Sequence, residues 1–110
     1  MSNPNVEASG TLTATGSATE DTLATISLPR TMSLIVDLTN LVGGDAVTLR
    51  VKRKILSGGA VRTVYKETFA GLQTDPGAIS VPIPSPHQCI VTLALETATP
   101  RNFDWSLESM

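Results

Sequence analysis

One stretch of the chain, residues 45–71, alternates apolar and polar residues with few interruptions and carries a glycine pair near its middle. It reads DAVTLRVKRKILSGGAVRTVYKETFAG. An alternation with a period of two places one set of side chains on each face of a β-strand, whereas a helix needs a period of about 3.6. Gly58 and Gly59 accept the left-handed angles that a tight turn demands. We therefore expect an antiparallel hairpin with one core face and one solvent face, which restricts the chain to β-rich folds.

The alternation also assigns side chains to the two faces of this hairpin. On the first strand the expected core residues are Val47, Leu49, Val51 and Ile55. On the return strand they are Val61, Thr63, Tyr65 and Phe69, and Val64 and Glu67 interrupt the pattern.

The opposite face of the hairpin gathers positive charge. Its cations are Arg50, Lys52, Lys54, Arg62 and Lys66. We predict that this basic ribbon binds a partner, because a local positive surface can meet an acidic protein surface or a phosphate. The alternative is a solvated face whose cations discourage pairing at a sheet edge.

Further strands are expected on both sides of the hairpin. Residues 22–28 and 32–38 are rich in β-branched and aliphatic residues, and Pro29 separates them. Residues 88–96 are apolar on both faces, which is typical of a strand in the middle of a sheet. Residues 79–86 carry prolines at alternate positions, which predicts an edge strand or an extended crossover. Large apolar side chains repeat every second residue from Phe103 onwards and are expected to cap the core.

These segments predict an all-β fold. The expected architecture is a single β-sandwich or jelly-roll-like domain of about seven to eight antiparallel strands. Residues 23–110 would form this domain. Residues 1–22 are small and polar and cannot bury enough apolar surface alone, so we expect an N-terminal arm that is flexible or that becomes ordered on a partner. The alternation of Thr11 and Thr13 with Leu12 also suits an edge strand.

Length, charge and hydrophobicity disfavour several classes of function. The chain has 110 residues, of which 41% are hydrophobic and 16% charged, with a formal net charge of −2. That length suits one domain, and that charge gives no overall field to hold nucleic acid or an anionic membrane. No run has the roughly 18 apolar residues of a membrane helix, and no early apolar run resembles a signal peptide. We expect a protein that is synthesised in the cytoplasm and is not exported.

The sequence predicts no enzyme and no cofactor. It contains one cysteine and one histidine, so it lacks the paired ligands of a common zinc site. Cys89 lies in an apolar run, and we interpret it as a core residue; a catalytic pair with His87 is the disfavoured alternative. Phosphate-binding glycine loops and nucleophile motifs are missing as well.

Three stretches carry a resemblance to a known family. They read DLTNLVGGDAVTLRVKRKILSGGAVRTVYKETFAG, ISVPIPS and VTLALETATPRNFDWSLE. In order and texture they resemble small β-sandwich structural proteins of tailed bacteriophages, which include capsid decoration (cement) proteins. The resemblance implies a virion protein on the capsid surface that binds the major capsid protein and stabilises the shell. A homo-oligomer, most simply a trimer at three-fold lattice points, would suit that role. The alternative is a tail- or fibre-associated module that binds carbohydrate or another host surface.

Overall fold

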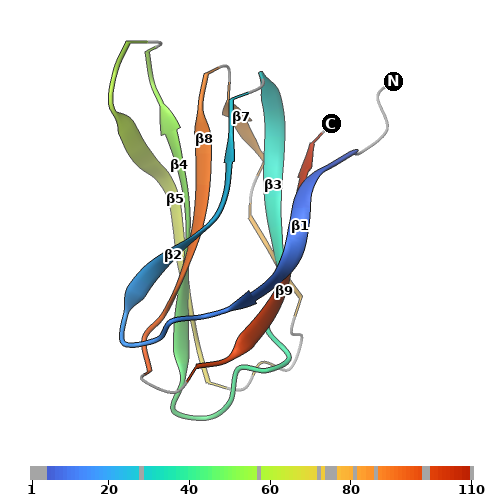
Figure 1. The fold of residues 1–110 in the computed structure, drawn as a ribbon, viewed down its shortest axis with the longest axis vertical. Helices are drawn as coiled ribbons and strands as arrows, with labels where there is room; N and C mark the ends of the chain where they lie inside the picture. Colours follow the sequence, from blue (N-terminus) through green and yellow to red (C-terminus); the bar gives the residue numbers. More distant parts are fainter. Residues whose placement is uncertain are drawn as a thin grey trace.

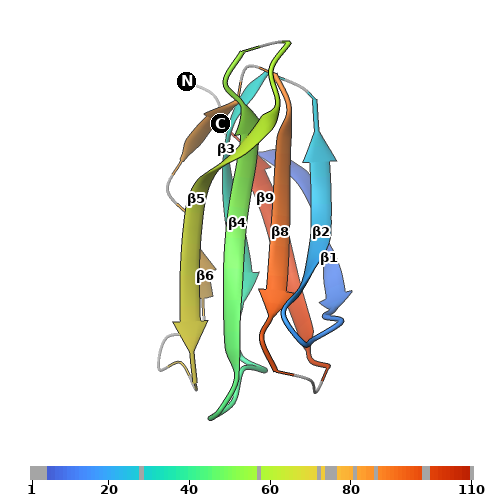
Figure 2. The same ribbon diagram turned by 90° about the vertical axis from the view of Figure 1, so that its left-hand side faces the viewer.

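The computed structural model describes residues 5–27, 29–56, 58–71, 73, 77–80, 82–85, 87–97 and 100–109. Within these residues the chain forms nine β-strands in two antiparallel sheets that pack together (Figure 1). Sheet A contains β1 (Asn5–Thr13), β9 (Asn102–Ser109) and β3 (Arg30–Asp37), followed by the short strands β6 (Gly77–Ile79) and β7 (Ile83–Ser85), which both pair with β3. Sheet B has the order β2 (Thr19–Ile26), β8 (Cys89–Leu95), β4 (Ala46–Lys54) and β5 (Val61–Ala70), and its outer face is turned toward the viewer in Figure 2. The predicted all-β sandwich is confirmed.

The core lies between the two central strand pairs. From sheet A it receives Met32, Leu34 and Val36 of β3 and Phe103 and Leu107 of β9. From sheet B it receives Val47, Leu49 and Val51 of β4 and Cys89, Val91, Leu93 and Leu95 of β8. These residues alternate along their strands, so each central strand turns one row of apolar side chains inward. The prediction that β8 lies inside a sheet is confirmed, and Phe103 and Leu107 are core residues as expected.

The N-terminal segment belongs to the sandwich. β1 pairs along its length with β9, and β2 pairs with β8 in the other sheet. The predicted separate arm of residues 1–22 is therefore wrong for residues 5–22, whereas the edge-strand interpretation of Leu12 and its neighbours is right; residues 1–4 lie outside the described part. The low apolar content misled us because an edge strand obtains its backbone hydrogen bonds from a neighbour and needs few large side chains of its own.

Bulges interrupt three of the four sheet edges. The extra, unpaired residue is Glu7 in β1, Leu23 in β2 and Val64 in β5, and each of these strands lies at an edge. The fourth edge is divided between β6 and β7, which pair with opposite ends of β3. The edge-strand alternative expected within residues 79–86 is confirmed for Ile79 and for Ile83–Ser85, whereas residues 81 and 86 lie outside the described part. Bulges and short strands prevent edge-to-edge pairing, so a partner is more readily bound by a face or a loop of this fold.

The β4–β5 hairpin is confirmed, with three corrections. Val61 and Thr63 were expected in the core, but the extra residue Val64 places them opposite Lys54 and Lys52, whose side chains point away from the core, and Thr63 is exposed. Ile55 was expected in the core, but it follows the end of β4 and is 56% exposed. Gly58 and Gly59 were expected at left-handed angles, yet the described glycines with positive φ are Gly16, Gly44 and Gly71. Six positions separate Lys54, the end of β4, from Val61, the start of β5, and the Gly59 amide donates to the Leu56 carbonyl at 2.9 Å. A connection of this length does not require the angles of a two-residue turn.

The described residues form strands, turns and loops, and they include no helix long and apolar enough to span a bilayer.

Candidate partner-binding surface

Four of the five cations predicted to bind a partner share the outer face of sheet B. Arg50, Lys52 and Lys54 alternate along β4 with the core residues, so they point away from the core. Lys66 lies directly opposite Arg50 in the register of β4 and β5, and directly opposed residues project from the same face. We call this set, Arg50, Lys52, Lys54 and Lys66, the cationic face.

Arg62 is separated from this set by the bulge at Val64. Val51 pairs with Tyr65, whereas the next residue, Lys52, pairs with Thr63. The extra residue reverses the alternation, and Arg62 lies opposite Arg53 rather than beside the cationic face. The predicted ribbon is therefore divided, because sequence periodicity cannot show where a bulge will fall.

Glu20 from β2 neutralises part of the cationic face. Its carboxylate lies 3.2 Å from the Arg50 guanidinium and also contacts the Lys52 ammonium. Strand β8 lies between β2 and β4, so the three long side chains meet across the width of one strand. The hydrogen bond from Lys52 lowers the pKa of the Glu20 carboxyl, partial burial opposes this shift, and the nearby positive charges reinforce it. Among the described residues, Lys54 and Lys66 have no ion-pair partner.

Arg53 serves the scaffold. Its guanidinium donates to the Pro84 carbonyl at 2.6 Å, and its Nε donates to the Lys54 carbonyl at 3.0 Å. The first of these hydrogen bonds links β4 of sheet B to β7 of sheet A, so Arg53 is engaged within the fold.

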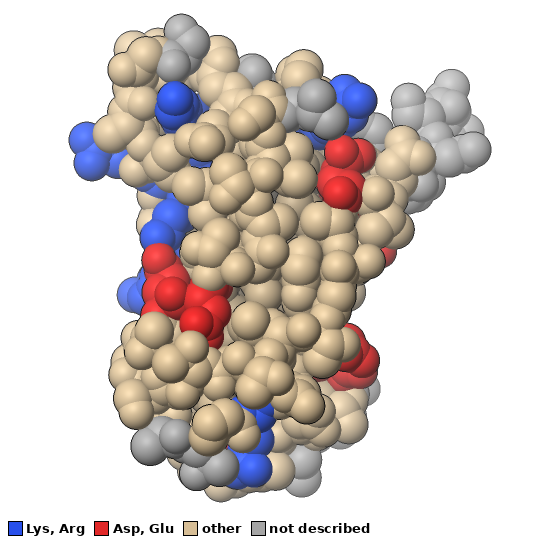
Figure 3. All heavy atoms as spheres, in the orientation of Figure 1, with Lys and Arg blue, Asp and Glu red and all other residues tan. Residues whose placement is uncertain are grey.

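The outer face of sheet A carries the opposite charge. Asp104 and Glu108 project from β9 and Asp37 from β3, at the positions that alternate with core residues. Figure 3 shows Lys and Arg at the upper left, over the β4–β5 hairpin, with an acidic group directly below them, and further acidic groups at the right, over β1 and β9. The outer face of sheet B is therefore mainly positive and that of sheet A mainly negative, although the net charge is small.

One buried ion pair joins the loops at an end of the sandwich. Asp45, just before β4, accepts a hydrogen bond from Arg101 Nε at 2.9 Å and another from the Val42 amide at 3.3 Å. The Asp45 side chain is 5% exposed and that of Arg101 is 30% exposed. Burial raises the pKa of the Asp45 carboxyl, but the bonds from Arg101 and Val42 outweigh it, and the net pKa lies below its ordinary value. This pair is a structural link between the β3–β4 loop and the residue just before β9.

The thiol of Cys89 is a core group, as the sequence predicted. It is fully buried in β8, and burial raises its pKa to about 11, although the charge of Arg53 opposes the shift. A thiol with that pKa is a poor nucleophile at neutral pH. Across the described ranges no three His, Cys, Asp or Glu side chains come close enough together to hold a metal ion.

Comparison with protein families, with curated proteins and with solved structures finds no match for this chain.

Replacing Glu20 with glutamine is expected to free Arg50 and Lys52 for an external anion. The folding free energy should change by less than about 1 kcal/mol, since partly exposed ion pairs contribute little. Retention on a cation-exchange column should increase. Glu67→Gln is the matched control, because Glu67 is exposed on β5 and changes the net charge equally. Equal shifts for the two variants would contradict the competition that we assign to Glu20.

Proposed function

We propose that this chain is a structural protein of a tailed-bacteriophage virion that binds the outer surface of the capsid and stabilises the shell. The sequence resemblance points to this class of protein. The observation that supports it in the molecule is the cationic face: a broad strand surface with Arg50, Lys52, Lys54 and Lys66 on one side of a β-sandwich. Its partner would be an acidic surface of the major capsid protein.

The construction of the fold suits docking by a face. With three edges bulged and the fourth divided, strand addition is disfavoured, and a sheet face can be presented repeatedly without aggregation. A decoration protein needs this property because many copies lie close together on a shell. Repeated weak contacts in a homo-oligomer, such as the proposed trimer, would add avidity.

The alternative role, a carbohydrate- or host-binding module, would be favoured by exposed aromatic rings. The chain has four aromatic residues. Phe103 is buried, and Tyr65, Phe69 and Trp105 pack against the core. Their positions favour the structural role.

The test is co-sedimentation with purified capsids that lack this protein. Lys66→Glu is expected to weaken binding at least about tenfold, because it reverses a charge on the cationic face that has no described intramolecular partner. Reversal of Arg50 or Lys52 is less suitable, since it would place a second carboxylate beside Glu20.

Arg30→Glu is the matched control, because Arg30 is exposed at the start of β3 in sheet A and the net charge changes equally. Binding of the wild type at a fixed ratio to the major capsid protein would support decoration. Absence of binding, or equal weakening by both variants, would overturn the assignment of the cationic face.

A further inference from the structure

The loop of the β4–β5 hairpin exposes two large aliphatic side chains beside positive charge. Ile55 is 56% and Leu56 is 72% exposed, at a turn where polar residues are usual. Lys54 belongs to the last strand pair before the loop, and Arg62 to the pair next to it. We call Lys54, Ile55, Leu56 and Arg62 the hairpin tip. It reaches the upper end of the molecule in Figures 1 and 2.

The outer face of sheet A contains a shallow hollow of complementary character. Its volume is about 220 Å³, its walls are predominantly apolar, and it is lined by Ile35, Asp37, Asp104, Trp105 and Ser106. Two hydrogen bonds hold the carboxylates in place: Asp37 accepts from the Thr39 amide at 2.9 Å, and Asp104 accepts from the Thr11 hydroxyl. The hollow therefore combines an apolar floor with two fixed negative charges.

We propose that the hairpin tip of one copy docks into the hollow of a second copy. An apolar cavity of about 150 Å³ can hold benzene, so the hollow has room for the Leu56 side chain. Docking would remove exposed apolar surface from both copies. It would also bring Lys54 and Arg62 toward Asp37 and Asp104, and such charge complementarity fixes the orientation of a contact.

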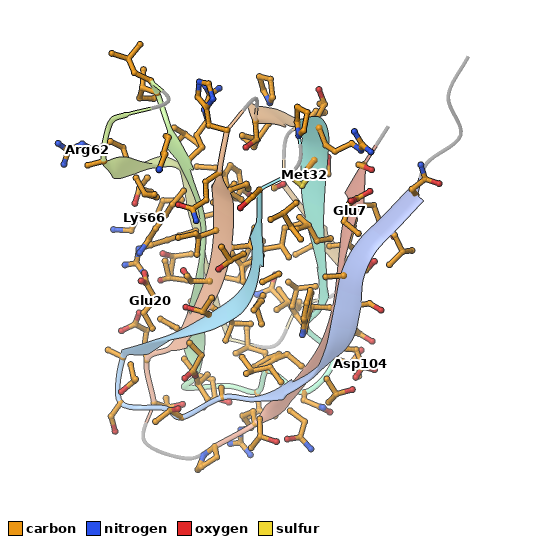
Figure 4. All side chains as sticks on the ribbon, turned by 45° about the horizontal axis from the view of Figure 1, so that its top comes forward. Glu7, Glu20, Met32, Arg62, Lys66 and Asp104 are labelled. Atoms are coloured by element: carbon orange, nitrogen blue, oxygen red, sulfur yellow. The ribbon has the colours of Figure 1, made fainter. Side chains whose placement is uncertain are left out.

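The two halves of this contact lie far apart on one molecule. Figure 4 shows Arg62 and Asp104 on opposite sides of the fold, so the tip cannot reach the hollow of its own chain. Each copy offers one tip and one hollow, which makes the interface head-to-tail. Such an interface closes into a ring when the rotation permits, and it otherwise continues as a chain. A three-membered ring would give the trimer expected from the sequence.

This contact shares only Lys54 with the proposed capsid contact. The other residues of the tip are Ile55, Leu56 and Arg62, whereas capsid binding is tested at Lys66, which lies opposite Arg50 and does not belong to the tip. Self-association can therefore fail while capsid binding holds, and the reverse is equally possible.

Two variants separate the halves of the contact. Ile55→Ser/Leu56→Ser removes the apolar tip but keeps the hollow. Asp37→Lys/Asp104→Lys reverses the charge of the hollow but keeps the tip. All four residues are outside the core, so both variants should retain the far-ultraviolet circular dichroism of the wild type.

Sedimentation velocity over a range of protein concentrations then measures the mass. The wild type is expected to form species larger than a monomer, and each variant alone is expected to be monomeric. An equimolar mixture should double the monomer mass and go no further, because one intact tip meets one intact hollow and the remaining halves cannot pair.

Three results would overturn the proposal. They are a wild type that stays monomeric at millimolar concentration, variants that associate as strongly as the wild type, and a mixture that stays monomeric. The last result would point to a symmetric tip-to-tip contact instead.

Discussion

Replacing Leu93 with alanine is expected to lower the free energy of unfolding by about 2–5 kcal/mol. Leu93 lies in β8, at the centre of sheet B, and its side chain is fully buried. The substitution removes apolar contacts and leaves a cavity that strands on both sides hold open. Single domains are stable by only about 5–15 kcal/mol, so a large share of the folding free energy is at stake. Urea unfolding followed by circular dichroism would measure the loss.

Leu56→Ala makes the same chemical change at a site that is 72% exposed. At concentrations low enough to keep the protein monomeric, its cost should stay within about 0.5 kcal/mol, since substitutions of exposed side chains usually have small effects on folding. Equal losses for Leu93→Ala and Leu56→Ala would contradict the packing of the two sheets described above.

Replacing Arg101 with methionine is expected to destabilise the domain by about 2–4 kcal/mol at neutral pH. The Asp45 carboxylate is almost completely buried and would lose its charged partner while keeping the hydrogen bond from the Val42 amide. An unpaired buried charge costs more than a broken pair at the surface. The same unfolding experiment measures this effect, and Arg30→Met, at an exposed arginine of β3, is the matched control.

The destabilisation should depend on pH with a defined sign. Asp45 has a lowered pKa in the folded protein, so its contribution is fully present above the unfolded value, about 3.9, and is lost as the pH falls through the folded pKa. In the variant, burial without Arg101 raises the pKa of the Asp45 carboxyl, and the unfolded states of the two proteins are alike. The difference between wild type and Arg101→Met should therefore be largest at neutral pH, decrease as the pH falls through the raised pKa of Asp45 in the variant, and be smallest once Asp45 is protonated in both proteins. A difference that does not change with pH would assign the effect of Arg101 to packing instead.

The two proposed contacts would divide the surface of the molecule. The cationic face would bind the capsid, and the hairpin tip and the hollow would join neighbouring copies. The charge separation between sheet A and sheet B supports this division. Two cationic faces, or two acidic outer faces of sheet A, would repel each other if they were brought into contact. On a shell, such lateral contacts would couple the binding of adjacent copies.

The hairpin was predictable because its information is local. Alternating side chains fix which residues of β4 face the core, and Val47, Leu49 and Val51 are all buried there. The strands β8 and β9 were visible in the same way. The position of Arg62 was not predictable, because the bulge at Val64 arises from pairing between two strands. A one-residue shift in register exchanges the faces of every residue beyond it.

The candidate surfaces were predictable only in part. The cations of the basic ribbon were predictable from the sequence, but their ion pairs with Glu20 were not. Glu20 lies in β2, which is separated from β4 by β8, and the sequence does not show that these strands belong to one sheet. The hollow joins Ile35 and Asp37 of β3 to Asp104, Trp105 and Ser106 of β9, and no short motif connects these positions. The incorporation of the N-terminal segment into the sandwich was missed for a similar reason, because β1 pairs with the last strand of the chain, β9.

The sequence by itself determined the β-class of the fold, the core row of the hairpin and the burial of Cys89, because periodicity and hydrophobicity act between residues close in the chain. Tertiary structure decided the strand order, the bulges, the Glu20 ion pairs, the Asp45–Arg101 link and the separation of charge between the two faces. Each of these depends on which distant strands become neighbours, and that choice follows from packing the whole core at once.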